Sequence, residues 1–112
     1  MNAKDVKEYR EKVSMVHIDG NLISYIAKIV NQTRNNSSLY LGASPRASLA
    51  ILTSSKAIAA MRGRDFVTPD DVKFVATPVL KHRVILTPEK EMEGITTKEV
   101  IKQIIEKIEV PR

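Results

Sequence analysis

The sequence predicts an all-α protein, a small bundle of about five helices, and three observations lead to this fold class. The 112 residues are enough for one small domain with a modest core. Apolar side chains recur at helical spacing along most of the chain, and a serine, threonine or aspartate precedes most of the expected helices. Aromatic residues make up only 4% of the chain, so we expect an aliphatic core.

Two helices and a short extended connector make up the first third of the chain. In the first helix, residues 3–13, the side chains of Val6, Tyr9 and Val13 share one face. Asp19 is a suitable N-cap for the second helix, which ends in a polar loop. The apolar positions of the second helix are Leu22, Ile23, Ile26, Ala27, Ile29 and Val30.

A third, central helix is expected from Ser44 to Met61. Gly42 gives the preceding loop a permissive backbone, Ser44 is a suitable N-cap, and Pro45 suits the first helical position, where no amide donor is needed. Apolar residues then cover most of the helix circumference, which predicts burial on several sides. They are Leu49, Ala50, Ile51, Leu52, Ala57, Ile58, Ala59, Ala60 and Met61. Gly63 is the expected C-terminal stop.

Arg46 does not fit this apolar helix. It falls in the first turn, where the positive end of the helix dipole disfavours a cation. A guanidinium at this position is favourable when it points at an anion, because helix amides and an arginine together can hold a phosphate group. The simpler interpretation is an arginine that extends into solvent, and the pattern alone leaves both open.

Another helix is expected to begin at Pro69. Thr68 is its cap, and Pro69 takes the first position. Asp70 and Asp71 lie near the positive end of its dipole. The apolar stripe of this helix is Val72, Val75, Ala76, Val79 and Leu80. Pro78 interrupts the stripe and predicts a kink or a new short helix.

The last helix opens with a capping box formed by Thr96 and Glu99. Its inward positions are Val100, Ile101, Ile104, Ile105 and Ile108. Residues 84–86 are apolar and rich in β-branched side chains, and we expect 109–111 to pair beside them as a minor two-stranded ribbon. The chain contains no internal repeat and no low-complexity segment.

Composition excludes several classes of function. Without cysteine the chain can form neither a disulfide nor a thiolate metal site, and His17 and His82 have no ligand partner at metal-binding spacing. No apolar run is as long as a membrane span, and the N-terminus is too charged for a signal peptide, so we expect a cytoplasmic location. Neither a phosphate-binding loop nor a catalytic carboxylate pair is present. The chain by itself is therefore not expected to be an enzyme.

Several segments, in order and at similar spacing, resemble the C-terminal helical lid of MoxR-type AAA+ ATPases. The resemblance runs from about Val16 to Leu86. The matching segments are Gly42–Ala47, Lys56–Ala57, Gly63–Val72 and Val79–Arg83. The shorter segments are unspecific alone, and together they make a strong resemblance.

The resemblance implies that residues 1–112 are the lid of a longer ATPase, whose upstream α/β domain holds ATP and Mg²⁺. In such proteins the lid packs over the nucleotide and supplies the sensor 2 arginine, which reaches the terminal phosphate. The family's Ser-Pro-Arg motif corresponds to Ser44, Pro45 and Arg46, so these residues are expected to contact nucleotide, with Arg46 acting in catalysis. Loss of that contact on hydrolysis would bias the angle of the lid.

By the same resemblance, the parent protein would be a ring, expected to be hexameric, that works as a chaperone-like remodeller. Its partners would be its own upstream ATPase domain, neighbouring subunits, and proteins with von Willebrand A-type domains. We expect the natural chain to continue upstream of residues 1–3 and to end near Pro111 and Arg112. The sequence does not identify the client.

Other charged residues in the matching segments are interpreted as structural. Arg64 and Asp65 are read as a pair that stabilises a turn. Arg34 ends its helix, where a cation is favourable to the dipole. For His82 and Arg83, a buried or surface-bridging role is favoured over contact with a neighbouring subunit.

Two other classes of function remain as alternatives. The net charge of +5 allows a free-standing basic helical module that binds nucleic acid. The basic residues are spread along the chain without a dense run or an aromatic platform, so this interpretation is less favoured. Salt-dependent affinity for DNA would support it. The second alternative is a protein-interaction bundle with no link to nucleotide, which an upstream phosphate loop would exclude.

Overall fold

The computed structural model describes residues 3–111 and confirms the all-α class with a small ribbon. The side chains of residues 3–6, Tyr9 and Leu41 are outside this description, and so are the expected chain limits at 1–2 and 112. The shared face predicted for Val6 and Tyr9 therefore stays a prediction. The helices and strands are α1 (Ala3–Ser14), α2 (Gly20–Arg34), β1 (Leu39–Leu41), α3 (Arg46–Met61), α4 (Pro69–Leu80), β2 (Ile85–Leu86), α5 (Pro88–Met92) and α6 (Thr97–Lys107).

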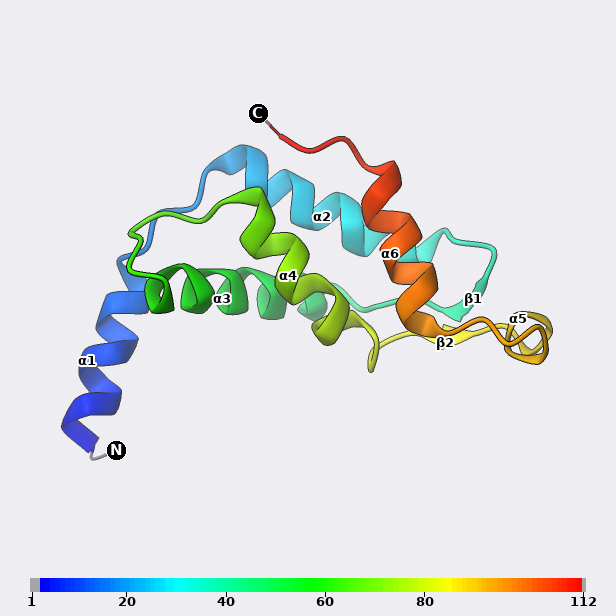
Figure 1. Cartoon of the computed structure of the whole chain (residues 1–112), viewed down its shortest axis with the longest axis horizontal. Coiled ribbons are helices and arrows are strands. Elements are labelled where there is room, and N and C mark those ends of the chain that lie inside the picture. The colour runs from blue at the N-terminus through cyan, green and yellow to red at the C-terminus, as the bar shows by residue number, and fades with distance from the viewer. Residues whose placement is uncertain (1–2, 112) are drawn as a thin grey trace.

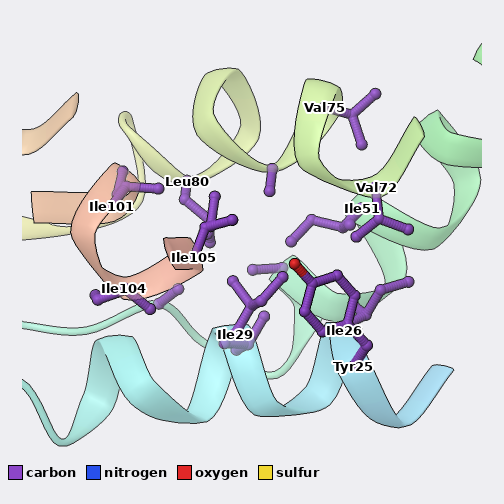
Figure 2. Close-up of a cluster of buried hydrophobic side chains, with 14 of the residues drawn as sticks. Tyr25, Ile26, Ile29, Ile51, Val72, Val75, Leu80, Ile101, Ile104 and Ile105 are labelled. Carbon is purple, nitrogen blue, oxygen red and sulfur yellow. The ribbon is translucent and has the colours of Figure 1, made fainter. Parts of the chain in front are cut away.

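Helix α3 is the centre of the arrangement. It packs against α4, α2 and α1, while α6 closes the other side of the bundle against α2 and α4 (Figure 1). Figure 2 shows how aliphatic side chains from α2, α3, α4 and α6 meet between these helices. Fully buried members of this core are Ile29, Ile51, Val72, Leu80 and Ile101. The expected aliphatic core is confirmed.

The central helix is less completely buried than predicted. Its buried positions are Ala47, Ile51, Ser55 and Ala59. Leu49 and Met61 are exposed, with 64% and 71% of their surfaces open to solvent. The apolar residues around the helix therefore predicted its central position correctly, but fewer of them are buried than expected.

Helix α2 turns most of the expected face inward, since Leu22, Ile26, Ile29 and Val30 are buried. Ile23 and Ala27 are exposed, and Tyr25, with 1% of its surface exposed, takes their place in the core. The Tyr25 side chain points from α2 toward α4 (Figure 2). Its hydroxyl is buried and has no hydrogen-bond partner among the described residues. Burial, together with the charge of Asp70, raises the pKa of Tyr25 above its ordinary value.

Tyr25→Phe is expected to leave the protein at least as stable as the wild type. The substitution removes a buried hydroxyl without a partner, and an unsatisfied buried polar group costs about 1–3 kcal/mol. Urea unfolding monitored by circular dichroism measures the change. A loss of more than about 1 kcal/mol, the typical worth of one hydrogen bond, would mean that the hydroxyl has a partner in solution.

Local signals placed several helix starts correctly. Asp19 accepts a hydrogen bond from the backbone N–H of Asn21, and Thr68 and Thr96 each head a reciprocal capping box. Helix α5 was not predicted, although its start repeats the Thr-Pro signal of α4, with Thr87 as the cap. This extra helix raises the number of helices above the expected five.

Two predictions in the second half of the chain are corrected in part. Pro78 does not begin a new helix, because it lies inside α4, which runs without a break from Pro69 to Leu80; the alternative of a kink stays a prediction. The ribbon exists, but β2 pairs antiparallel with β1, with Leu86 opposite Leu39. Residues 109–111 form no strand, and the partner strand comes from the segment before α3.

Candidate functional site at the start of helix α3

The loop before α3 places the predicted site at the surface. The helix begins at Arg46, and Pro45 takes the N-cap position with φ −57° and ψ −24°. The Ser44 side chain caps nothing; its carbonyl accepts the backbone N–H of Ala47 at 2.9 Å. Capping by Ser44 and the first helical position for Pro45 are therefore corrected. Because Pro45 already has helical φ and ψ, it directs the backbone into the first turn of α3.

This loop is fixed to the end of helix α2. The buried Thr33 hydroxyl donates to the carbonyl of Val30 at 2.6 Å and accepts the backbone N–H of Ala43 at 3.0 Å. Gly42 lies so close to α2 that an added Cβ would be 2.5 Å from the Cα of Arg34 and 2.6 Å from the carbonyl oxygen of Thr33. The start of α3 is thus held by backbone contact, which a glycine alone permits.

Arg46 is exposed on the first turn of α3, and among residues 3–111 no carboxylate forms an ion pair with it. A hollow of about 650 Å³ lies next to this turn. Its lining residues are Arg34, Tyr40, Gly42, Ala43, Ser44, Pro45 and Arg83. Of the three predicted site residues, Ser44 and Pro45 line the hollow, and Arg46 follows them directly without lining it.

Arg34 and Arg83 of the hollow, and His82 beside Arg83 in the sequence, form no ion pair with a described residue. Arg34 is the last residue of α2, as expected, but Asn35 caps the helix, with its backbone N–H bound to the carbonyl of Gln32. His82 and Arg83 are both exposed, and neither side chain bridges to another described residue. The structural roles expected for His82 and Arg83 are therefore corrected. The alternative, contact of His82 and Arg83 with a neighbouring subunit, stays a prediction.

The opposite end of α3 is closed by a Schellman motif. Gly63, with φ +74°, follows the C-cap residue Arg62. Its N–H binds the carbonyl of Ala60 at 3.0 Å, and the N–H of Arg64 binds the carbonyl of Ala59 at 2.9 Å. The predicted stop at Gly63 is confirmed, and the motif turns Arg64 back toward α4.

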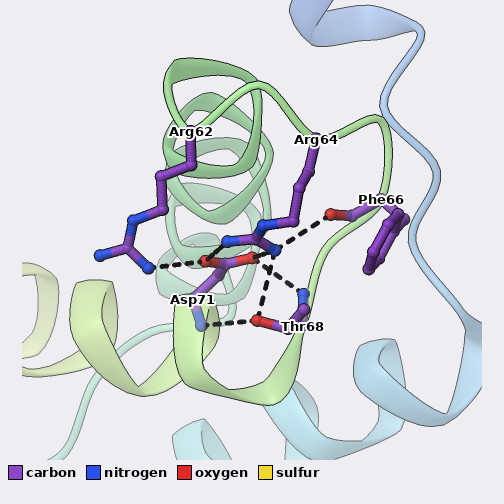
Figure 3. Close-up of polar contacts among 5 residues, drawn as sticks. All are labelled: Arg62, Arg64, Phe66, Thr68 and Asp71. Carbon is purple, nitrogen blue, oxygen red and sulfur yellow. Dashed lines mark hydrogen bonds and ion pairs between the residues drawn. The ribbon is translucent and has the colours of Figure 1, made fainter.

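Arg64 forms a bidentate ion pair with Asp71 at the start of α4, which corrects the expected pairing with Asp65 (Figure 3). Its Nη1 and Nη2 atoms lie 2.7 and 2.6 Å from the two carboxylate oxygens. Arg62 adds a longer contact of 3.2 Å to Oδ1, and the backbone N–H of Thr68 donates to Oδ2 at 2.9 Å. The Asp71 side chain is completely buried. This cluster joins the end of α3 to the start of α4.

The charge of Asp71 is maintained by these contacts. Burial by itself would raise the pKa of the carboxyl, but hydrogen bonds from Arg64 and Thr68 outweigh it and lower the pKa below its ordinary value. The same hydrogen bond to Asp71 raises the pKa of Arg64. The cluster is therefore a fully ionised structural link. It lies at the other end of α3 from Arg46.

Neither a metal-ligating cluster nor a membrane-spanning helix is found among the described residues. No group of three or more potential metal-ligating side chains lies together among residues 3–111. None of the described helices is both long enough and apolar enough to cross a membrane. The hollow beside Arg46, with its arginines, is the candidate site that the geometry favours.

The arrangement belongs to a known class of domain. The family model for the AAA lid domain matches residues 31–104, so the chain belongs to the AAA lid domain family. The matched range includes the Ser-Pro-Arg motif, the Schellman turn and the arginine–aspartate cluster.

Relatives named MoxR are among the matches, as predicted. The chain is 37% identical over 102 residues to the uncharacterised protein YeaC of Bacillus subtilis, covering 91% of this chain and 32% of that protein. It is 35% identical over 100 residues to the chaperone MoxR1 of Mycobacterium tuberculosis, covering 81% of this chain and 26% of that protein. The chain thus spans about a third or less of these relatives.

A solved structure has the same fold. A crystal structure of a presumed ATPase from Cytophaga hutchinsonii matches with a TM-score of 0.92 and 36% identity, covering 97% of this chain and 36% of that one. Together with the family model and the relatives, this similarity identifies the chain as a lid domain of the MoxR type of AAA+ ATPase.

Proposed function

We propose that the chain is the lid of a longer cytoplasmic AAA+ ATPase, in which Arg46 is the sensor 2 residue. The observation that carries this proposal is the position of Arg46. It is exposed on the first turn of the central helix, has no acidic partner among the described residues, and follows Ser44 and Pro45 in the family's order. An unpaired guanidinium at this position is free to bind the terminal phosphate of ATP.

The parent protein would supply the remaining chemistry. A phosphate loop and the Mg²⁺ ligands would belong to an upstream α/β domain of the longer ATPase. A water molecule would attack the γ-phosphorus, ADP would leave, and Arg46 would stabilise the charge on the transferred phosphoryl oxygens. The relative named chaperone MoxR1 supports a chaperone-like remodeller. This remodeller would be a hexameric ring and would act with von Willebrand A-type partner proteins.

Arg46→Ala in the full-length protein is expected to lower kcat for ATP hydrolysis about 10- to 100-fold, since a charge-assisted hydrogen bond contributes about 1.5–3 kcal/mol. Turnover and ATP affinity would be measured for wild type, Arg46→Ala and the conservative Arg46→Lys. Lys102→Ala, an exposed cation on α6, is the matched control and should keep wild-type turnover.

The thermal melting curve of each variant separates catalysis from folding. Arg46 is exposed, so its removal should leave the melting temperature of the lid unchanged. Unchanged turnover in Arg46→Ala would refute the sensor assignment and would leave the lid with a role in packing and ring assembly alone.

A further inference from the structure

The distribution of acidic residues along the chain is uneven. Aspartate and glutamate are absent from residues 20–64 and again from 72–88. The first range contains α2, β1 and α3, and the second contains Arg83 and β2. Every residue that lines the hollow beside α3 therefore comes from a segment without a carboxylate.

Two arginines of this hollow have no carboxylate partner, either in the neighbouring sequence or in space. Arg34 comes from the end of α2 and Arg83 from the turn after α4, and neither has an ion pair among residues 3–111. Ordinary surface arginines are interspersed with carboxylates, and a concave surface of one charge concentrates counter-ions. The hollow is thus a positively charged concavity whose natural occupant is an anion.

We infer that Arg34, Arg83 and Tyr40 form a binding site for the phosphate groups of a nucleotide, in addition to Arg46. The inference rests on the proposed function for the identity of that ligand. The planar guanidinium offers two parallel donors that match phosphate oxygens. At about 650 Å³ the hollow lies within the range of small-molecule sites.

The position of the site suits one extended polyanion. Ser44 and Pro45 form part of the hollow wall and connect directly to Arg46, so a polyphosphate in the hollow would lie beside the first turn of α3. Tyr40 on β1 is 77% exposed, which leaves its ring free to stack on a base and its hydroxyl free to donate to a phosphate. Arg34 and Arg83 would then hold the ligand while Arg46 reads the terminal phosphate.

The test is binding of tripolyphosphate and of ATP to this chain, measured by calorimetry at low salt and by amide chemical shifts. We expect saturable binding, with the largest shifts at Arg34, Tyr40, Gly42 and Arg83. Arg34→Gln and Arg83→Gln should each weaken tripolyphosphate binding about tenfold or more, in line with a lost charge-assisted hydrogen bond. Lys102→Gln removes the same charge from exposed α6 and should change affinity less than twofold.

Comparison of ATP with tripolyphosphate shows which part of a nucleotide the hollow recognises. Equal affinity for ATP and tripolyphosphate means that the site reads phosphate groups alone. Tighter binding of ATP, lost in Tyr40→Ala, means that the base stacks on the ring. The inference is overturned if the control weakens binding as much as Arg34→Gln and Arg83→Gln do, or if a polyglutamate peptide binds more tightly than tripolyphosphate. The latter result would assign the hollow to an acidic protein partner.

This result is separable from the test of Arg46. If Arg46→Ala leaves ATP turnover intact while Arg34 and Arg83 still determine tripolyphosphate affinity, the sensor assignment fails and the phosphate site stands. If Arg46→Ala abolishes turnover and the isolated chain binds neither ligand, the sensor assignment stands and the phosphate site fails.

Discussion

Asp71→Ala is expected to lower the free energy of unfolding by about 3 kcal/mol or more, since removing one partner of a buried ion pair costs about 3–5 kcal/mol. The substitution removes the bidentate partner of Arg64 and one half of the capping box with Thr68. We place the expected cost toward the lower end of that range, because the Arg64 side chain is 25% exposed and can turn toward water. Urea unfolding at neutral pH measures the loss.

The adjacent aspartate provides a matched control. Asp70 also lies in the first turn of α4, but it is exposed and forms no ion pair with a described residue. Asp70→Ala should therefore cost only the favourable interaction with the helix dipole, about 0.3–1 kcal/mol. Similar losses for Asp70→Ala and Asp71→Ala would contradict the role assigned to the buried cluster.

The same carboxylate predicts an acid-dependent loss of stability. Its pKa is lowered by folding from an ordinary value of 3.8, so the native state favours the ionised form. The stabilisation is complete well above pH 3.8 and declines as the pH falls through 3.8 toward the folded-state pKa. Asp71→Asn has no such proton to bind. The difference in unfolding free energy between wild type and Asp71→Asn should therefore shrink as the solution is acidified.

Gly42→Ala is expected to destabilise the chain by about 3 kcal/mol, near the upper end for overpacking. The added Cβ would lie 2.5 Å from the Cα of Arg34 and 2.7 Å from its nitrogen. Both are backbone atoms, so relief requires the loop to move away from α2. That movement would break the hydrogen bond between the Ala43 N–H and Thr33 and would displace Arg46.

A second glycine shows whether the effect is specific. Gly20 is the first residue of α2, and an added Cβ there meets nothing within 4 Å. Gly20→Ala should be neutral or slightly stabilising, because alanine restricts the unfolded chain. Thermal unfolding of both variants measures the comparison. A melting temperature for Gly42→Ala equal to that of Gly20→Ala would show that the loop is not held by close contact.

The elements that could be predicted from sequence are those with local signals. The N-cap residue, the apolar positions and the C-terminal glycine of a helix lie within a few residues of one another. The helix ends at Asp19, Thr68, Gly63 and Thr96 were therefore predicted correctly. The partner of a strand has no local signal. Residues 85–86 pair with β1, which precedes α3, and not with the predicted segment 109–111.

The candidate site was predicted in part for the same reason. Ser44, Pro45 and Arg46 are contiguous and form one motif, whereas Arg34 and Arg83 reach the hollow from separate elements. Their connection depends on how α2 and α4 pack, which no local pattern encodes. The absence of carboxylates from residues 20–64 was a readable signal of a positively charged surface. This gap is visible only when charges are followed along the chain, because the net charge sums over all residues.

Helix α3 is attached at its two ends to different neighbours. Thr33 and Gly42 hold its start to α2, and Arg64 and Asp71 hold its end to α4. Its 16 residues form a rod of about 24 Å at 1.5 Å per residue. A rod held at both ends would transmit a tilt of its first turn to α4 at the far end, so a displacement at Arg46 is expected to move the helices together rather than one loop alone.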